Sequence, residues 1–250
     1  MLKTCYRIRL HEGFLLLVDG LGRAGERGII RQERFRQNTK MLRLLLVRHG
    51  ETDWNQQMRF QGHTDVALNA RGIEQAETIA HRLRSEPLQA IYSSDLQRAM
   101  QTAQIVAKYH HLTPIADPDL RELSYGVWEG MSREEILASE WAELFDRYRK
   151  DSLRHRPPGA EYPDQIIERS RRVLERVRRQ HREGTVCLVG HGGSLRALIC
   201  VALSAPLETF RHIRLDNASL SMIECGTDWM WVSLVNDTCH LNQEKIQPVI

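Results

Sequence analysis

The sequence predicts an α/β fold, a three-layer sandwich in which a mostly parallel sheet carries helices on both faces within a single domain. Two apolar runs, Leu42–Val47 and Thr185–Gly190, have the length and composition of buried strands. Segments with helical spacing of apolar residues separate the strand-like runs. Strands that alternate with helices build parallel sheets that are covered on both faces.

The first half of this pattern begins directly after Met41. Following the strand at Leu42–Val47, Asn69 can cap a helix that runs to about Ser85, with an apolar face formed by Ile73, Ala76, Ala80 and Leu83. Ala90–Ser93 is then a short strand. A helix from about Leu96 to Tyr109 follows it, with its inward residues at Leu96, Ala99, Ala103 and Val106.

The second half begins with a capping box over Ser132–Glu135, which opens a short helix. A long helix covers about residues 163–182, and its buried stripe is formed by Ile166, Ile167, Ser170, Val173, Leu174 and Val177. After the strand at Thr185–Gly190 we expect a helix over Leu195–Leu203. Ser219–Glu224 and Met230–Val235 then form a hairpin across residues 226–228.

Residues 123–164 interrupt the alternation with aromatic and basic side chains. The aromatic residues are Trp128, Trp141, Phe145, Tyr148 and Tyr162, and the basic cluster is Arg147, Arg149, Lys150, Arg154, His155 and Arg156. One interpretation is a helical insertion with a solvated basic face, because runs of charge usually face water. The other is a partial lid that selects the substrate, because such insertions often carry specificity on a rigid scaffold.

The net charge changes sign at Met41. Residues 1–40 hold nine Lys or Arg and four Asp or Glu, a net charge of +5, whereas residues 41–250 hold 26 and 28, a net charge of −2. We expect a domain over 41–250, preceded by a basic extension over 1–40 that is disordered or reflects a start codon assigned too early. The basic pI therefore gives no support to nucleic-acid binding by the domain.

The length of the apolar runs and the spacing of the cysteines indicate the cellular compartment of the protein. No apolar stretch approaches the ~18 residues of a membrane span, so we expect no membrane partner. The five cysteines are widely spaced, with no Cys-x-x-Cys pair. That pattern favours reduced thiols in the cytoplasm over a disulfide framework. The sequence indicates no oligomeric state.

A His-Gly pair follows each of the two apolar strands. Arg48, His49 and Gly50 come after the first strand, and His191, Gly192 and Gly193 come after the second. In open α/β sheets ligands bind outside the carboxyl ends of the strands. The neighbouring Arg and the glycine amides near a helix start indicate that the ligand is an anion. A single such histidine is more often a hydrogen-bonded core or turn residue, but two at strand ends favour a shared site.

A metal site is the rival interpretation of the histidines, and its candidate ligands are His49, His63, His110, His111 and His191. No two of these residues have the i, i+4 spacing of helical ligands, and no acidic residue is placed as in hydrolytic metal motifs. We therefore expect neither a metal nor another cofactor.

The segment Leu46–Thr52 with Asn55 resembles the signature of the histidine phosphatase superfamily, also called phosphoglycerate-mutase-like. The resemblance extends from about residue 41 to residue 236. It includes Gln61-Gly62, Leu68-Asn69, Gly72, Ser93–Ala99, Thr102-Ala103, Leu120–Leu123, Gly126, Trp128–Gly130, Gly190–Gly193 and Asp216–Ala218.

Hydrolysis of a phosphate monoester requires a nucleophile, fixed positive donors and an acid for the leaving oxygen. We expect His49 to attack phosphorus and form a phosphohistidine, Arg48 and Arg98 to hold the phosphate oxygens, and His191 to donate to the same group. Neutral donors would be Asn55 and the amides of Gly192 and Gly193. The resemblance adds Gln61 and Gly62 to the substrate site, and it assigns the proton donor to Glu122.

Plainer roles exist for three of these residues. Arg98 has the position of a surface arginine near a helix start, Glu122 has Arg121 beside it as an ion-pair partner, and Asn55 has the side chain of a turn cap.

Three functions compete within the resemblance. The first is a cytosolic phosphatase for small phosphorylated metabolites, similar to alpha-ribazole phosphatase and the broad-specificity phosphatases. The others are a cofactor-dependent phosphoglycerate mutase and a non-catalytic module that binds phosphorylated ligands. The short matching region of about 195 residues favours the phosphatase, as does Gly193, where mutases typically have Asn. The sequence does not indicate the physiological substrate.

Overall fold

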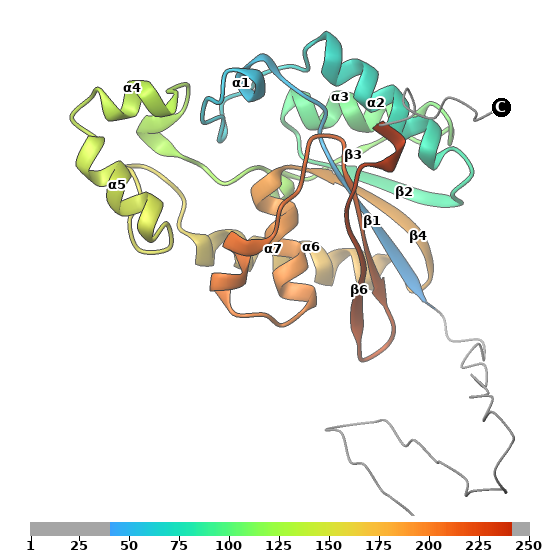
Figure 1. The fold of residues 1–250 in the computed structure, drawn as a ribbon. Coiled ribbons are helices and arrows are strands. Elements are labelled where there is room, and N and C mark those ends of the chain that lie inside the picture. The colour runs from blue at the N-terminus through green and yellow to red at the C-terminus, as the bar shows by residue number, and fades with distance from the viewer. Residues whose placement is uncertain (1–40, 242–250) are drawn as a thin grey trace, which may run out of the picture. The chain divides into compact units, whose positions relative to one another are not determined.

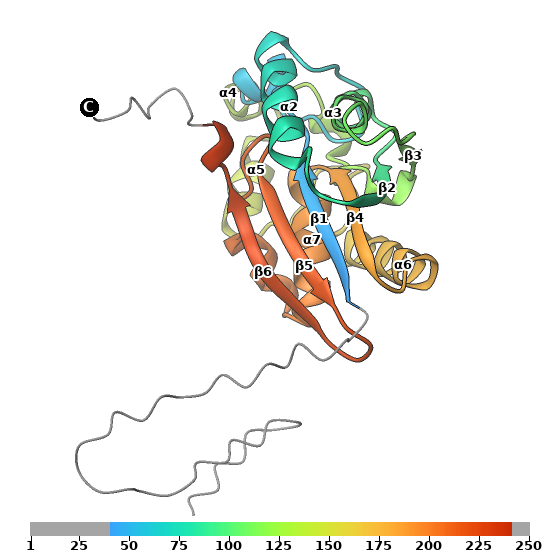
Figure 2. The same ribbon diagram turned by 90° about the vertical axis from the view of Figure 1, so that its right-hand side faces the viewer.

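The computed structural model describes residues 41–241, which form one mixed six-stranded sheet with helices on both faces. The predictions made for residues 1–40 lie outside the described residues. The strand order is β3-β2-β4-β1-β5-β6, and the strands are β1 (Leu42–Arg48), β2 (Leu88–Ser93), β3 (Ile115–Ala116), β4 (Gly184–Gly190), β5 (Leu220–Cys225) and β6 (Met230–Asp237). Figure 2 shows β6, β5, β1 and β4 side by side. The predicted fold class is confirmed.

The four strands from β3 to β1 pair in parallel, and the antiparallel hairpin of β5 and β6 adds two strands at the β1 edge. β1 pairs with β4 in parallel, β4 with β2, and β2 with β3. β5 lies antiparallel to β1 and to β6. The hairpin predicted from the sequence therefore extends the sheet beyond β1.

The α-helices are α1 (Asp53–Gln56), α2 (Ala70–Leu83), α3 (Gln97–Ala107), α4 (Arg133–Leu137), α5 (Ala142–Lys150), α6 (Pro163–Gln180) and α7 (Gly192–Ala202). The 3-10 helices η1 (Pro118–Leu120), η2 (Gly126–Trp128) and η3 (Leu207–His212) lie between these elements, and a further 3-10 turn covers residues 239–241. The N-cap at Asn69 and the capping box at Ser132 are both present. α7 begins three residues earlier than expected, directly after His191. No helix within residues 41–241 is long and apolar enough to cross a membrane.

The two faces of β1 contribute to two separate cores. Leu42, Leu44 and Leu46 pack with residues of α6 and α7, whereas Leu45 and Val47 pack with residues of α2 and α3. Figure 1 shows these two helix pairs on opposite sides of the sheet. Because both faces are covered, β1 is apolar at nearly every position instead of at every second one.

The prediction that Ile73 belongs to the core is wrong. Ile73 is 48% exposed, and α2 instead faces the core with Gly72, Ala76, Ile79, Ala80 and Leu83. A β-carbon at Gly72 would lie 2.0 Å from the carbonyl oxygen of Glu51. This close approach sets the rotation of the helix, and one residue further along the chain Ile73 is turned away from the sheet.

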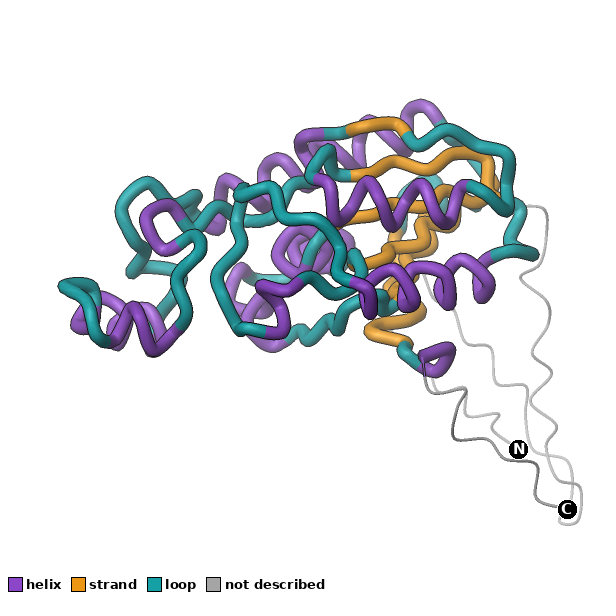
Figure 3. The backbone as a smooth tube through the Cα atoms, turned by 90° about the horizontal axis from the view of Figure 1, so that it is seen from above, coloured by secondary structure: helices purple, strands orange, loops and turns teal. Residues whose placement is uncertain are grey.

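The insertion between η1 and α6 has a small hydrophobic core of its own. Trp128, Ile136 and Phe145 are buried there, with Phe60 and Tyr148 packed against them. Figure 3 shows α4 and α5 set to one side of the helices that cover the sheet. Most of the aromatic residues noted in the sequence therefore stabilise the insertion itself, while Tyr162 is exposed.

Candidate active site

The parallel pair β1 and β4 brings the two His-Gly motifs together. Arg48 lies opposite Gly190 in the strand register, and the amide of His49 donates to the carbonyl of Gly190 over 3.0 Å. As a result, the rings of His49 and His191 lie with their centroids 5.0 Å apart. The structure therefore places both motifs side by side at the carboxyl ends of these strands, where the sequence predicts a shared site.

The ring of His49 has a defined tautomer. Its Nδ1 lies 2.6 Å from the carbonyl oxygen of Gly50. A carbonyl oxygen only accepts hydrogen bonds, so Nδ1 carries the proton and donates. The lone pair therefore belongs to Nε2, which gives this buried imidazole a nucleophilic nitrogen.

The ring of His191 has the opposite tautomer. The Nε of Arg98 donates to Nδ1 of His191 over 3.2 Å, because a guanidinium only donates. The proton of His191 must then be on Nε2, an atom that is buried without a hydrogen-bond partner in the described residues. One histidine thus offers a lone pair and its neighbour offers a donor.

Burial keeps both rings neutral. The pKa of His49 is lowered well below 6.5 by burial and then by the positive charges of Arg98 and Arg48. The pKa of His191 is lowered well below 6.5 by burial, followed by Arg98 and His49. Because a neutral imidazole retains a lone pair, this environment suits nucleophilic attack near neutral pH.

The two arginines are held at the site in different ways. Arg98 is fully buried, and it donates to His191, to the carbonyl of Thr64 and to the carbonyl of Gly62. Burial lowers its pKa to about 10, so it remains cationic at neutral pH. Arg48 donates to the carbonyl of Leu215 over 2.6 Å, while its Nε is buried without a partner in the described residues. The interpretation of Arg98 as a surface residue is wrong.

Glu122 is positioned by main-chain amides instead of by Arg121. Its Oε1 accepts from the amides of Leu123 and Gly193, each over 2.8 Å. Arg121 pairs with Asp95. A β-carbon at Gly193 would lie 2.1 Å from Oε1 of Glu122, so this carboxylate requires a glycine there. The expectation that the Gly193 amide serves the anion is therefore corrected, because that amide already donates to Glu122.

The remaining predicted residues lie around the same cleft. A cleft of about 480 Å³ is lined by Arg48, His49, Asn55, Gln61, Gly62, Arg98, Glu122 and Gly192, all residues expected from the sequence. Asn55 does cap a turn, since its Oδ1 accepts from the amide of Thr52. Its side chain therefore combines the plainer role with a place in the cleft.

His49 and His191 lie side by side, but the other candidate ligands of the rival metal site do not complete a metal-binding cluster with them among the described residues. His110 and His111 follow the C-terminal end of α3, whereas Arg98 lies in the first turn of that helix. His63 bonds through Nε2 to the carbonyl of Glu122. Within residues 41–241, no three His, Cys, Asp or Glu side chains are arranged so that they can hold a metal ion.

Several residues of the site were not assigned a role from the sequence. Arg196 and Tyr125 also line the cleft, together with Trp54, Met58, Phe60 and Ile213. Asn217 donates to the carbonyls of His49 and Gly50 and to the side chain of Asn55. The Asp216–Ala218 motif was the available signal for Asn217, whereas nothing in the local pattern distinguishes Arg196 from a surface residue.

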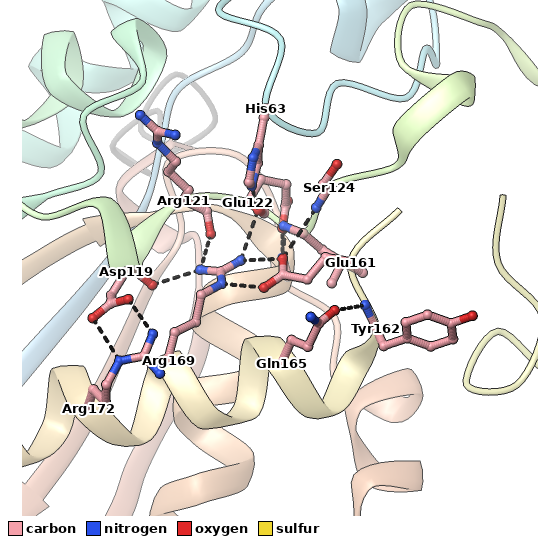
Figure 4. Close-up of polar contacts among 12 residues, drawn as sticks. His63, Asp119, Arg121, Glu122, Ser124, Glu161, Tyr162, Gln165, Arg169 and Arg172 are labelled. Carbon is pink, nitrogen blue, oxygen red and sulfur yellow. Dashed lines mark hydrogen bonds and ion pairs between the residues drawn. The ribbon is translucent and has the colours of Figure 1, made fainter. Parts of the chain in front are cut away.

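Arg169 of α6 holds the segment that carries Glu122, as Figure 4 shows. The buried guanidinium donates to the carbonyls of Asp119, Arg121 and Glu122 and pairs with Glu161 over 2.7 Å. These contacts fix the main chain just before and at Glu122. The sequence places Arg169 on a long helix but does not indicate that it is buried.

Comparison with known proteins gives consistent results. Residues 44–238 match the description of the histidine phosphatase superfamily (branch 1). Phosphoserine phosphatase 1 of Hydrogenobacter thermophilus is 36% identical over 207 residues, which cover 83% of this chain and 98% of that protein. A probable phosphoglycerate mutase of Yersinia pestis is 36% identical over 221 residues, covering 82% and 98%.

Solved structures show the same fold. The alpha-ribazole phosphatase of Shigella flexneri superposes with a TM-score of 0.73 at 29% sequence identity, covering 78% of this chain and 96% of that one.

The neutral histidines predict a pH dependence of stability. Because the folded-state pKa of both rings lies below the unfolded value of 6.5, the unfolded chain binds more protons at acidic pH. The contribution of these rings is complete above pH 6.5, and it is lost as the pH falls from 6.5 through the folded-state pKa. Unfolding in urea between pH 8 and pH 5 should show this loss for the wild type. The loss should be smaller for a His191→Gln variant, and an equal loss in both proteins would contradict the assignment for His191.

Replacing Arg169 should destabilise the domain more than replacing an exposed arginine of the same helix. Arg169→Met leaves the carboxylate of Glu161 and three carbonyls without their donor, which should cost about 3–5 kcal/mol of unfolding free energy. Arg172→Met removes an exposed pair with Asp119 and should cost about 0–1 kcal/mol. Urea unfolding measures both values, and similar losses would show that Arg169 contributes no more than a surface ion pair.

Proposed function

The chain belongs to the histidine phosphatase superfamily, and we propose that it hydrolyses small phosphate monoesters through a phosphohistidine on His49. The observation that carries the proposal is the pair of opposite tautomers. His49 has its lone pair on Nε2, and the buried His191 beside it has its proton there. Arg48, His49 and Arg98 line one cleft. This arrangement suits a reaction in which a dianion gains charge at its oxygens while a nitrogen attacks phosphorus.

In the first step, Nε2 of His49 forms a bond to phosphorus as the bond to the leaving oxygen breaks. Arg48, Arg98 and the Nε2–H of His191 stabilise the charge on the three transferring oxygens. Glu122 in its acid form gives its proton to the leaving oxygen, which departs as an alcohol.

In the second step, a water oxygen forms a bond to phosphorus and the bond to His49 breaks. The carboxylate of Glu122 takes a proton from this water, which restores the acid form for the next cycle. Inorganic phosphate leaves, and the imidazole of His49 is neutral again. No metal or other cofactor takes part in the proposed steps.

A phosphoglycerate mutase is the second candidate, because some relatives carry that name. It would return the phosphoryl group from His49 to a second hydroxyl instead of to water. A binding module would do neither. Rapid quench with labelled substrate distinguishes the three functions by released phosphate, by transferred label and by the absence of turnover.

The substrate we propose is a small phosphorylated metabolite, and the location is the cytoplasm. The names of the phosphatase relatives support the substrate class. The four cysteines in the described residues are all free, which suits a reducing compartment.

Replacing the nucleophile should abolish turnover and leave the domain folded. His49→Ala should lower kcat by about 10⁴-fold or more, because no neighbouring group can replace a covalent nucleophile. Denatured samples from rapid quench should contain no protein-bound label. His81→Ala, which removes an exposed histidine from α2, is the matched control and should retain wild-type kinetics. Activity of His49→Ala within about tenfold of wild type would rule out the phosphohistidine.

The role of Glu122 should depend on the leaving group. Glu122→Gln keeps an oxygen that can accept from the amides of Leu123 and Gly193, but it cannot donate a carboxylic proton. In single-turnover phosphorylation, it should lose about 10²–10⁴-fold on an alkyl phosphate, whose alkoxide needs a proton. The loss should be much smaller on p-nitrophenyl phosphate, whose phenolate leaves readily. Equal losses on both substrates would assign Glu122 a positioning role and place the acid elsewhere.

A further inference from the structure

A second pocket lies beside the proposed active site and is lined by arginines. It has a volume of about 230 Å³ and lies among α5, the start of α6, α7 and η3. We call it the arginine pocket and define it by Arg149, Arg156, Arg196, Arg211, Tyr125 and Tyr148. No Asp or Glu is found in its lining. Arg196 and Tyr125 also line the reaction cleft, so the two spaces share a wall.

The four guanidinium groups have no carboxylate partner in the described part of the chain. Ten other arginines of the described residues do pair with acidic side chains, namely Arg43, Arg59, Arg71, Arg121, Arg147, Arg154, Arg169, Arg172, Arg176 and Arg214. What distinguishes the arginine pocket is that four unpaired guanidinium groups line one cavity. A guanidinium is charged at neutral pH. The arginine pocket therefore concentrates positive charge that the protein itself does not neutralise.

Two of these arginines keep donors that the protein does not satisfy. The guanidinium of Arg156 stacks at 5.5 Å from the ring of Tyr125 and 5.8 Å from that of Tyr148, and its Nε is buried without a partner. Its other nitrogens make only long main-chain contacts of 3.4 and 3.5 Å. Arg196 donates from Nε to the carbonyl of Gly192, and its terminal nitrogens have no hydrogen-bond partner within residues 41–241.

The tyrosines add no negative charge to the pocket, and their side chains hydrogen-bond to each other. Burial raises the pKa of both Tyr125 and Tyr148, so the phenols stay protonated. Arg211 has a structural part, since it donates to the carbonyls of Lys150 and Arg149 and so ties η3 to the end of α5. Planar guanidinium groups bind carboxylates and phosphates through paired hydrogen bonds.

We propose that the arginine pocket binds an oxyanion, a carboxylate or a phosphate, that is separate from the phosphoryl group attacked by His49. The oxyanion has two possible sources, the leaving group of the substrate and a free anion in solution. Because Arg196 contacts both spaces, either source would affect the reaction cleft. Only the substrate source rests on the proposed phosphatase function.

Calorimetry with inorganic phosphate tests the pocket without any turnover. The wild-type full chain should bind two phosphates, one in the reaction cleft and one in the arginine pocket. Arg156→Gln should bind one, and Arg154→Gln, which removes an exposed arginine outside the pocket, should bind two. Arg149→Gln provides a second test if Arg156→Gln proves unstable in a thermal melt, since Arg149 is exposed.

A matched series of substrates tests the leaving-group source. Alkyl phosphates of increasing length carry either a terminal carboxylate or the corresponding amide. For Arg156→Gln, the ratio of kcat/KM between carboxylate and amide should fall about tenfold to a hundredfold, as expected for a lost hydrogen bond to a charged group. The loss should appear mainly in KM, and Arg156→Lys should recover part of it.

The outcomes separate the possibilities. Two phosphate sites in the wild type, of which Arg156→Gln loses one, together with an unchanged substrate ratio would assign the pocket to a free anion. A lowered ratio would assign it to the leaving group, and two sites retained in Arg156→Gln would place the second phosphate outside the pocket. A single phosphate site in the wild type together with an unchanged ratio would overturn the proposal. If the enzyme hydrolyses none of the esters, the proposed function fails, while calorimetry still decides whether the pocket binds an anion.

Discussion

The parallel, in-register pairing of β1 with β4 is the constraint on which the site depends. Arg48 lies opposite Gly190 in that register, so β1 and β4 end at the same level of the sheet. Each strand is followed directly by its His-Gly motif. The pairing is stabilised on both faces, because alternate residues of β1 belong to two cores built with α6 and α7 or with α2 and α3. A shift of one residue would exchange those faces and separate the two histidines. The hydrophobic cores and the geometry of the candidate site therefore depend on the same alignment.

Burial and positive charge then set the chemistry of the two rings. Both histidines are removed from water, and the charges of Arg98 and Arg48 disfavour a further proton. The hydrogen bond of His49 to the carbonyl of Gly50 leaves the lone pair of that ring on Nε2. The hydrogen bond from Arg98 to Nδ1 of His191 places the proton of that ring on Nε2. An anion entering the cleft would meet fixed donors and would itself compensate the positive charge. The reaction cleft is thus complementary to a phosphoryl group. Without an anion in the cleft, the burial of the two arginine cations costs free energy of folding.

The helices beyond the sheet position the rest of the site through main-chain contacts. Arg169 of α6 fixes the carbonyls of the segment that ends at Glu122, and the amide of Gly193 at the start of α7 orients its carboxylate. The insertion that carries α4 and α5 contributes Tyr125, Tyr148 and Arg156 beside this segment. Its aromatic residues form a core, while part of its basic character lies at a pocket next to the cleft. The exposed side chains of Arg147, Lys150 and Arg154 agree with the interpretation of a solvated basic face, whereas the role of a lid that selects the substrate stays a prediction.

The sequence by itself determined five of the six strands of the described sheet, the main helices and the two motifs that end β1 and β4, because apolar periodicity and glycine are local signals. It also identified eight of the residues that line the cleft, through the order and spacing of their motifs. It did not predict β3, which is only two residues long. Only the tertiary structure decided the burial of Arg98 and Arg169, the solvent exposure of Ile73, the engagement of the Gly193 amide by Glu122, and the unpaired arginines around Tyr125. Each of these depends on contacts between residues that are distant in the chain. An arginine on a helix has the same local pattern whether it faces water or three carbonyls, so its environment emerges only when the elements pack together.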